Sequence, residues 1–210
     1  MKKDLIVFVA HIDDFECACY GYVFKHHKEY NKIKIITATT WDKKIPVWEE
    51  NLNLFPKEIL DKIEDINLGF AQRRLNTDFD DLKDKFYQLI NFNSNFDILT
   101  HDEKDCHTDH TVLFKIAKGM YKYTEKFVTI YSPSSANFNP NYYVGLPKKV
   151  YDIKKIALDK YNIQVEQSYS KLGYYLQSDA HYNIGKAYVL ENCVNTNYDY
   201  YEVYKILKWG

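Results

Sequence analysis

The sequence contains little glycine and no glycine-rich phosphate loop. Gly occurs at only 7 of the 210 positions, and no G-x-G-x-x-G pattern is present. That pattern is the usual signature of a loop whose backbone amides approach the phosphates of a dinucleotide. The sequence therefore offers no support for a nucleotide cofactor.

The chain also lacks a paired cysteine motif. Its four cysteines form no C-x-x-C pair, and they are Cys17, Cys19, Cys106 and Cys193. In a chain of this size without a secretion signal, such cysteines are expected to be reduced and mostly packed in the interior. Cys106 stands next to His107 and is an alternative nucleophile, although the aspartates and histidines around it account for a site without a thiol.

Long apolar runs and an excess of one charge are missing as well. No apolar run approaches the ~18 residues that a membrane-spanning helix requires. The short apolar run at the start is followed by two aspartates, unlike a signal peptide. The 28 basic and 29 acidic residues give a formal net charge of −1. We therefore expect a cytoplasmic protein with no nucleic-acid partner and no membrane span, and a homo-oligomer stays open.

The composition that remains is that of a globular protein with one well-filled core. Hydrophobic residues make up 46% of the chain and charged residues 27%, which argues against disorder. Domains average ~150 residues, so we expect residues 1–210 to form a single domain.

Apolar runs alternate with helix-like spacing along the chain. Strands are expected at residues 3–9, 32–40, 96–101 and 126–132, with a weaker edge strand at 200–209. Helices are expected at about 15–30, 57–67, 80–91, 108–123 and 152–169, with loops at 41–56 and 133–147. Strand, helix and strand at this spacing predict βαβ units, so the fold class is α/β with a mostly parallel sheet.

Two clusters of histidine and aspartate directly follow two of the expected strands. The first contains His11, Asp13 and Asp14, and the second contains Asp105, His107, Asp109 and His110. Taken alone, each cluster could be the acidic, capped start of a helix. Because the carboxyl ends of parallel strands meet at one edge of a sheet, the two clusters together predict a shared site.

A catalytic zinc needs three protein ligands of mixed histidine and carboxylate type, with one position left open for water. His11, Asp14 and His110 can supply these three ligands. Iron or cobalt could occupy the same ligands.

Three further residues of the clusters then stand beside the metal. Asp13 can take a proton from water as a general base. His107 can stabilise an oxyanion or protonate a leaving amine, and Asp109 could hold the His107 ring in place.

These motifs resemble those of a known family, the zinc-dependent PIG-L/LmbE-type N-acetylglucosaminyl deacetylases. Its signatures are an A/P-H-P-D-D-E turn and a later D-x-H-x-D-H turn, and this sequence has "AHIDDFE" and "DCHTDH". "FDILTH" is similar to the strand that precedes the family's second turn, and "YYEVY" to its closing A-E-x-F. Matches to a K-x-x-A-L-x-x-Y-x-S-Q helix are Lys154, Ala157, Leu158, Tyr161 and Gln164.

The resemblance implies a Rossmann-like sheet flanked by helices, with the active site at the carboxyl edge of the strands. It implies removal of an N-acetyl group from an amino sugar, carried as a nucleotide-sugar, a glycolipid or another glycoconjugate. It assigns the zinc ligands to His11, Asp14 and His110, the general base to Asp13, and the group acting on the tetrahedral intermediate to His107, with Asp109 as its partner.

The sequence departs from the family pattern in the first turn. Ile12 replaces the motif proline, and Phe15 stands where a glutamate is expected. Glu16 comes one residue late, which on a helix turns its side chain by about 100°. The family's R-x-x-E pair has no clear counterpart, since Lys57 aligns only loosely.

Several interpretations therefore stay open. His101 and Asp105 could orient ligands or touch substrate, and His181 could reach the pocket from the C-terminal region. The first function hypothesis is a zinc-dependent deacetylase of amino sugars. Its alternatives are a sugar-binding or regulatory protein that keeps the metal pocket without turnover, and an amidohydrolase that acts on a non-sugar amide.

Overall fold

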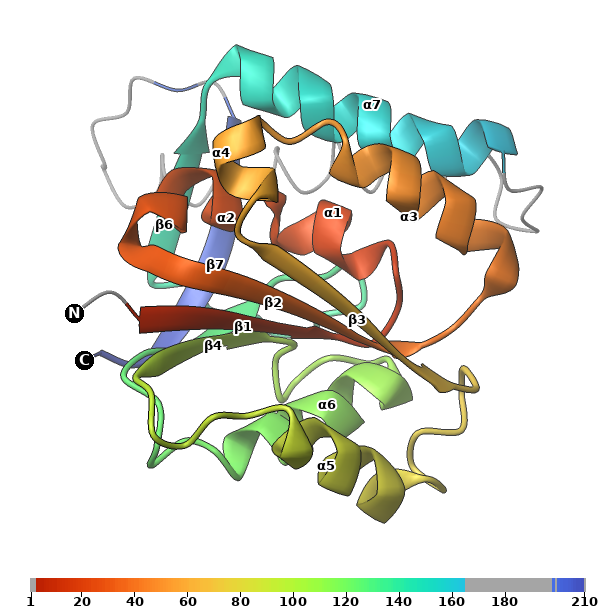
Figure 1. The fold of residues 1–210 in the computed structure, drawn as a ribbon, viewed down its shortest axis with the longest axis vertical. Helices are drawn as coiled ribbons and strands as arrows, with labels where there is room; N and C mark the ends of the chain where they lie inside the picture. The colour runs from red at the N-terminus through yellow and green to blue at the C-terminus, as the bar shows by residue number, and fades with distance from the viewer. Residues whose placement is uncertain (1–2, 165–197, 199, 210) are drawn as a thin grey trace.

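The fold is built on one mixed β-sheet. The computed structural model describes residues 3–164, 198 and 200–209. Its strands are β1 (Lys3–Val9), β2 (Tyr30–Thr39), β3 (Ile63–Phe70), β4 (Phe96–Thr100), β5 (Phe127–Ile130), β6 (Tyr142–Leu146) and β7 (Tyr200–Lys208). They lie in the order β3-β2-β1-β4-β5-β7-β6 (Figure 1). The first five in this order are parallel, and β7 runs antiparallel to both of its neighbours.

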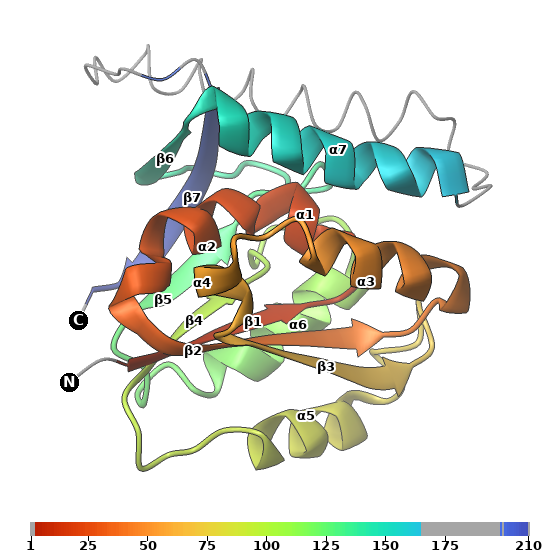
Figure 2. The ribbon, with the colours of Figure 1, turned by 45° about the horizontal axis from the view of Figure 1, so that its top comes forward.

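Helices cover both faces of the sheet. They are α1 (Asp14–Ala18), α2 (Tyr20–His26), α3 (Ile45–Leu52), α4 (Lys57–Leu60), α5 (Phe79–Gln88), α6 (Thr108–Lys118) and α7 (Lys148–Gln164). Figures 1 and 2 show α5 and α6 on one face and the other helices on the opposite face. Among the described residues, no helix has both the length and the apolarity that crossing a membrane needs.

The central strands are buried because both of their faces are covered. Every residue of β4 is buried, as are the last five residues of β1. Alternate side chains of β1 enter two separate apolar layers, with Val7 in one and Phe8 in the other. The ring of Phe8 stacks on Phe86 of α5 with centroids 4.0 Å apart. This double burial explains why the apolar runs of these strands do not alternate with polar residues.

The predicted α/β class with a mostly parallel sheet is confirmed, whereas two predictions between β2 and β4 are wrong. The helix predicted at 57–67 ends at Leu60, and residues 63–70 form β3 instead. Gly69 lies within this strand at a φ of 75°. The side chains of β3 are only partly buried, because it is an edge strand, and its mixed sequence therefore has no continuous apolar run. The loop predicted at 41–56 contains α3, which begins at Ile45.

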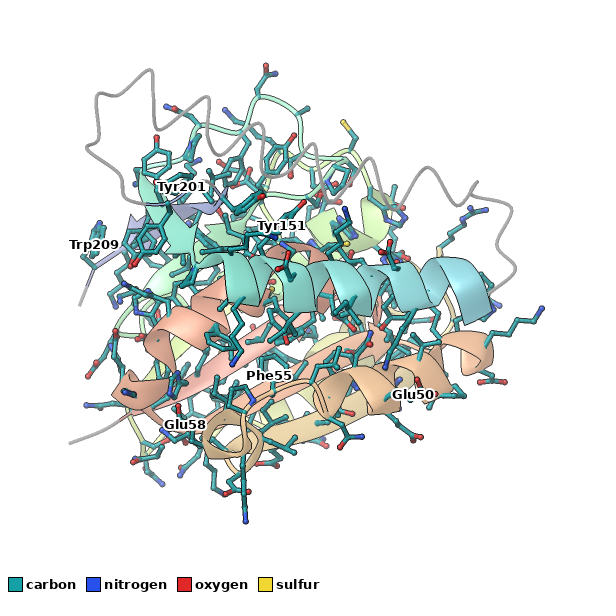
Figure 3. All side chains as sticks on the ribbon, turned by 90° about the horizontal axis from the view of Figure 1, so that it is seen from above. Glu50, Phe55, Glu58, Tyr151, Tyr201 and Trp209 are labelled. Carbon is teal, nitrogen blue, oxygen red and sulfur yellow. The ribbon has the colours of Figure 1, made fainter. Side chains whose placement is uncertain are left out.

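The helix predicted at 15–30 is interrupted. Its residues form α1 and α2, which meet at Cys19, and a short 3-10 turn precedes β2 at Tyr30. The helix predicted at 152–169 begins earlier, at Lys148, and its last residues lie outside the described part. Figure 3 looks down on α7, where Tyr151 and Tyr201 lie on one side of the helix.

The C-terminal strand occupies an interior position of the sheet. β7 was predicted as an edge strand, but it pairs with β5 on one side and with β6 on the other. β6 forms the edge, and it lies inside the segment predicted as a loop at 133–147. The polar residues of that segment made the short strand hard to recognise.

A fully buried ion pair joins the C-terminal strand to the first helices. Lys154 Nζ lies 2.6 Å from Glu202 Oε1, and both side chains are completely inaccessible. Glu202 Oε2 accepts the backbone N–H of Gly21 at 2.8 Å, at the start of α2. A Cβ at Gly21 would lie 2.6 Å from that carboxylate oxygen, so only glycine allows this approach. The lysine of the family-like helix and the glutamate of "YYEVY" therefore belong to one buried contact.

Candidate metal centre

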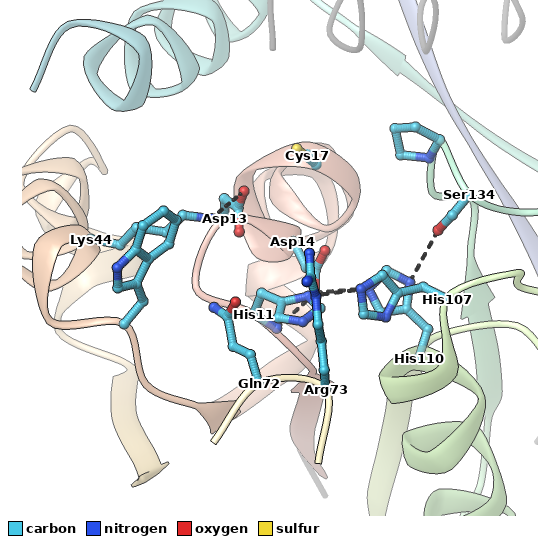
Figure 4. Close-up of a pocket in the computed structure, with 12 residues that line it drawn as sticks. His11, Asp13, Asp14, Cys17, Lys44, Gln72, Arg73, His107, His110 and Ser134 are labelled. Atoms are coloured by element: carbon cyan, nitrogen blue, oxygen red, sulfur yellow. Dashed lines mark hydrogen bonds and ion pairs between the residues drawn. The ribbon is translucent and has the colours of Figure 1, made fainter. Parts of the chain in front are cut away.

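The two histidine and aspartate clusters meet above the carboxyl ends of β1 and β4. The two strands are parallel neighbours with Val7 opposite Leu99, so the segments that follow them leave the sheet side by side. They line a cavity of about 210 Å³ together with the loops after β2, β3 and β5. Figure 4 shows the cavity with the side chains that point into it. The predicted position of the site, at the carboxyl edge of the sheet, agrees with this arrangement.

Three of the expected ligand atoms form a compact triangle. His11 Nδ1 lies 3.1 Å from Asp14 Oδ2, and His110 Nε2 lies 3.3 Å from each of these atoms. A tetrahedral zinc with bonds of about 2.0–2.1 Å holds its ligand atoms about 3.3 Å apart. The spacing and the chemistry of these donors therefore fit a single zinc ion without rearrangement of the loops.

Asp109 orients His11. Its Oδ2 accepts a hydrogen bond from His11 Nε2 at 3.3 Å and another from the backbone N–H of Arg73 at 2.7 Å. This contact leaves the lone pair of Nδ1 directed at the triangle, as carboxylates behind metal-binding histidines commonly do. The expected pairing of the Asp109 carboxylate with the His107 ring is not made in the described structure. Asp109 instead contacts His107 through its backbone N–H.

Asp105 plays the same part for His110. His110 Nδ1 donates to Asp105 Oδ2 at 3.0 Å. The same carboxylate accepts the backbone N–H of His107 at 2.8 Å and the hydroxyl of Ser134 at 2.6 Å. Ser132 and Ser135 also donate to it. Of the roles left open for Asp105, the structure supports ligand orientation. The serines were not singled out from the sequence, because nothing in the chain links residues 132–135 to residue 105.

Both histidines of the triangle lie in a strongly negative environment. Burial lowers the pKa of His11, but the charge of Asp14 and hydrogen bonds to Asp109 and Asp14 outweigh it and raise this pKa to about 9. The pKa of His110 rises to about 10 against the same effect of burial, through Asp14 and Asp105. A site that stabilises positive charge on two imidazoles also stabilises a cation held between them.

His101 and His107 are close to the triangle, but their lone pairs are in use. Two further triplets have possible ligand atoms that all lie within 4.8 Å of one another, namely Asp14–His101–His110 and His11–His107–His110. His101 Nε2 accepts the N–H of Ala10 at 3.1 Å, and His107 Nδ1 accepts that of Asp109 at 3.2 Å. A neutral imidazole has only one acceptor nitrogen. Neither ring can therefore ligate a metal without losing its backbone contact. His101 packs against His110 instead, with ring centroids 3.7 Å apart.

The backbone contact also defines the protonation of His107. With Nδ1 accepting a hydrogen bond, the ring proton of the neutral form resides on Nε2. Burial lowers the pKa of His107, and the charges of His110 and His11 lower it further. His107 is therefore a neutral hydrogen-bond donor at the cavity wall, which favours the oxyanion-stabilising role over proton delivery to an amine.

Asp13 is paired with a lysine that the sequence did not identify. Lys44 Nζ lies 2.8 Å from Asp13 Oδ2, and its side chain is only 6% exposed. Burial raises the pKa of Asp13, but the charge of Lys44, its hydrogen bond and the charge of His11 together outweigh burial and keep this pKa below its ordinary value. Asp13 is thus ionised and held at the cavity. Lys44 comes from the segment after β2, which was predicted only as a loop.

The residues that depart from the family pattern lie behind the cavity. Phe15 is buried in the core, with its ring 5.4 Å from that of Trp48. Glu16 is also buried, and Asn51 and Tyr161 donate to its carboxylate at 2.9 and 2.8 Å. Burial raises the pKa of Glu16 to about 8. Its side chain does not line the cavity, so it does not replace a site residue.

His26 and His27 do not line the cavity. His26 contacts Glu29 and Tyr142, and His27 lies 3.4 Å from Glu58. His181 lies outside the described residues. Cys106 is exposed, and its backbone N–H donates to Ser134.

The fold matches solved structures over almost the whole chain, although no protein-family model and no curated protein sequence matches it. An N,N'-diacetylchitobiose deacetylase from Pyrococcus horikoshii has a TM-score of 0.68 at 14% identity, covering 98% of this chain and 84% of its own. The 4-carboxy-2-hydroxymuconate hydratase from Pseudomonas putida has a TM-score of 0.67 at 14% identity, covering 98% and 96%. A teicoplanin deacetylase, solved in a zinc inhibited form, has a TM-score of 0.64 at 8% identity, covering 97% of each chain. At these identities the likeness shows the fold.

Proposed function

We propose that this protein is a zinc-dependent hydrolase that removes an N-acetyl group from an amino sugar. The observation that carries the proposal is the triangle of His11, Asp14 and His110, whose donor atoms lie 3.1–3.3 Å apart. Two carboxylates orient its imidazoles from behind. The two family-like motifs and the shared fold of deacetylase structures support the same reading.

A zinc ion held by His11, Asp14 and His110 would act as a Lewis acid that polarises the amide carbonyl and acidifies water. The chain supplies the proton transfer. Asp13 is ionised beside the ligands, and its carboxylate takes the proton of the attacking water. The same proton then passes to the departing amine, which leaves Asp13 ionised again.

His107 and Lys44 support this transfer without exchanging protons. The Nε2–H of His107 donates a hydrogen bond to the oxygen that becomes negative when the carbonyl is attacked. Lys44 keeps Asp13 ionised and directs its carboxylate towards the cavity. Arrangements of this kind stabilise charge at the place where it develops, which is the main way in which active sites lower a barrier.

The proposal is tested by metal analysis together with acetate release. The purified protein should hold about one zinc per chain, and His110→Ala should remove it. Wild type should release acetate from N-acetylated sugars, whereas Asp13→Asn should keep the zinc and lose about 10³-fold in kcat/KM. Cys106→Ser is the matched control, since this exposed side chain adjoins the same motif, and it should keep both zinc and activity.

The outcomes separate the alternatives. If wild type and Asp13→Asn are equally inactive on free, nucleotide-linked and lipid-linked N-acetyl sugars while zinc stays bound, the sugar-binding interpretation replaces the enzyme. Acetate release only from non-sugar amides supports the other hydrolase. Because the shared fold includes a hydratase, fold alone does not choose the reaction.

A further inference from the structure

Arg73 places a positive charge in the cavity. It lies in the loop after β3, and its side chain lines the same cavity as His11, Asp14 and His110 (Figure 4). Arg73 is exposed. Its guanidinium forms no hydrogen bond or ion pair with residues 3–164, 198 or 200–209. Within the described part of the chain, the only hydrogen bond of Arg73 to another side chain runs from its backbone N–H to Asp109 Oδ2, at 2.7 Å. The charged end is therefore available to a ligand.

The backbone at Arg73 would suit glycine better. Its φ is 62°, in the left-handed region that side chains disfavour. The backbone N–H contact to Asp109 requires no side chain at all. The bond that positions Asp109 behind His11 therefore explains the conformation, but it does not explain why an arginine occupies the position.

Arginine is rare in this chain, and one of its two arginines lines the cavity. The chain has 28 basic residues, and only Arg73 and Arg74 among them are arginines. Elsewhere lysine serves every basic position. Arginine differs from lysine in its planar fork of donors, which binds carboxylate and phosphate groups in a bidentate way. In a chain whose other basic residues are almost all lysines, a guanidinium group thus lies at the wall of the cavity.

The acidic side chains of the cavity already have partners. Asp13 lies 2.8 Å from Lys44, and Asp14 contacts His11 and His110 within 3.3 Å. Neither forms an ion pair with Arg73 in the described structure. An anionic group of the ligand would therefore supply the negative charge that pairs with the Arg73 guanidinium.

We propose that Arg73 binds an anionic group of the substrate, a carboxylate or a phosphate, while the acetylated nitrogen lies at the metal centre. The substrate class is then an acidic N-acetyl sugar rather than a neutral one. This inference rests on the proposed function, because it names the substrate of that same site.

The test compares three probes that differ in charge. N-acetylglucosamine is neutral, N-acetylmuramic acid adds a carboxylate, and N-acetylglucosamine 6-phosphate adds a phosphate. The measured quantity is the ratio of kcat/KM for each acidic sugar to kcat/KM for the neutral one. In wild type the ratio should exceed one for at least one acidic sugar, and whichever is preferred identifies the group. Arg73→Gly should lower that ratio by about 10-fold to 100-fold, the usual effect of losing a hydrogen bond to a charged group.

The variants are matched to the local structure. Glycine accepts the φ of residue 73 and keeps the backbone N–H for Asp109, so Arg73→Gly removes only the side chain. Arg73→Lys should keep part of the preference, since it retains charge but loses the fork. Arg74→Ala is the control, because it removes an equal charge from the neighbouring exposed position, and it should leave the ratio unchanged.

A binding measurement separates this inference from the proposed function. Titration calorimetry with the same three sugars on the zinc-loaded Asp13→Asn protein, with and without Arg73→Gly, requires no turnover. Loss of acidic-sugar binding in the double variant supports the role of Arg73 even if no acetate is ever released. The inference is overturned if Arg73→Gly weakens all three sugars equally, if it weakens none, or if Arg74→Ala has the same effect.

Discussion

The two segments that build the candidate metal centre are held in place in different ways. In the first, residues 11–14, the side chains depend on distant partners, since His11 is oriented by Asp109 and Asp13 is paired with Lys44. In the second, residues 105–110, much of the support is local. Asp105 accepts hydrogen bonds from the His110 ring and from the His107 backbone within its own segment.

This difference predicts which parts of the site are preformed. Asp105 also accepts hydrogen bonds from the hydroxyls of Ser132, Ser134 and Ser135, so several donors hold its carboxylate in place. In the described structure the carboxylate of Asp109 has two hydrogen-bond partners, the His11 ring and the backbone of Arg73. The second segment should therefore keep its geometry when the first is disturbed, whereas the reverse should not hold.

The largest expected effect comes from exchanging the two supporting carboxylates for amides of the same size. Asp105→Asn should weaken zinc binding by about 100-fold and Asp109→Asn by about 10-fold, the range found for residues behind metal ligands. The loss of zinc affinity should be larger for Asp105→Asn because the Asp105 carboxylate accepts more hydrogen bonds than the Asp109 carboxylate. Competition with a zinc chelator measures both. Equal losses would remove the distinction between the segments.

A smaller effect is expected from removing the partner of Asp13 with Lys44→Met. Lys44 holds the pKa of Asp13 below its ordinary value of 3.8, so in wild type the base stays ionised through the whole neutral range. Without Lys44, burial and the nearby Asp14 raise this pKa, and activity should be lost at a higher pH on the acidic side. The kcat/KM of the variant relative to wild type should be about 10-fold lower at pH 5 than at pH 8.

The same pair links pH to stability. Because the folded-state pKa of Asp13 is depressed, its contribution to stability is fully present above pH ~4 and is lost as the pH falls through the lowered value. Lys44→Met should reduce the amount of stability that the protein loses as the pH falls. A pH series of thermal unfolding on both proteins measures it, and identical profiles of activity and stability would show that Lys44 does not act on Asp13.

The smallest effect is expected from Ser134→Ala. This change removes one donor to Asp105, at 2.6 Å, while the His107 backbone, His110, Ser132 and Ser135 remain. Zinc affinity should change by no more than about threefold, and stability by about 1 kcal/mol. Chelator competition and thermal unfolding measure the two quantities. A loss as large as that of Asp105→Asn would mean that the serine loop, rather than the local segment, holds the second cluster.

The fold was predictable where buried strands appear in the sequence as continuous apolar runs. The runs at 5–9 and 96–100 are buried on both faces, and they were recognised as strands because apolar residues do not alternate with polar ones there. The edge strand β3 was mistaken for a helix, since its half-exposed residues form no continuous apolar run. β7 was predicted at an edge because its residues alternate only weakly, whereas it lies between β5 and β6.

The sequence by itself determined which donor groups are available and that they follow two strands of one sheet. Only the tertiary structure decided which group faces which. It placed Asp109 on His11 instead of His107, left His107 with its proton on Nε2, and brought Lys44 and Arg73 to the cavity. The physical reason is that a hydrogen bond or ion pair requires approach within about 3 Å. Such an approach between loops from different strands is decided by how the sheet is ordered and packed, which no local pattern of residues encodes.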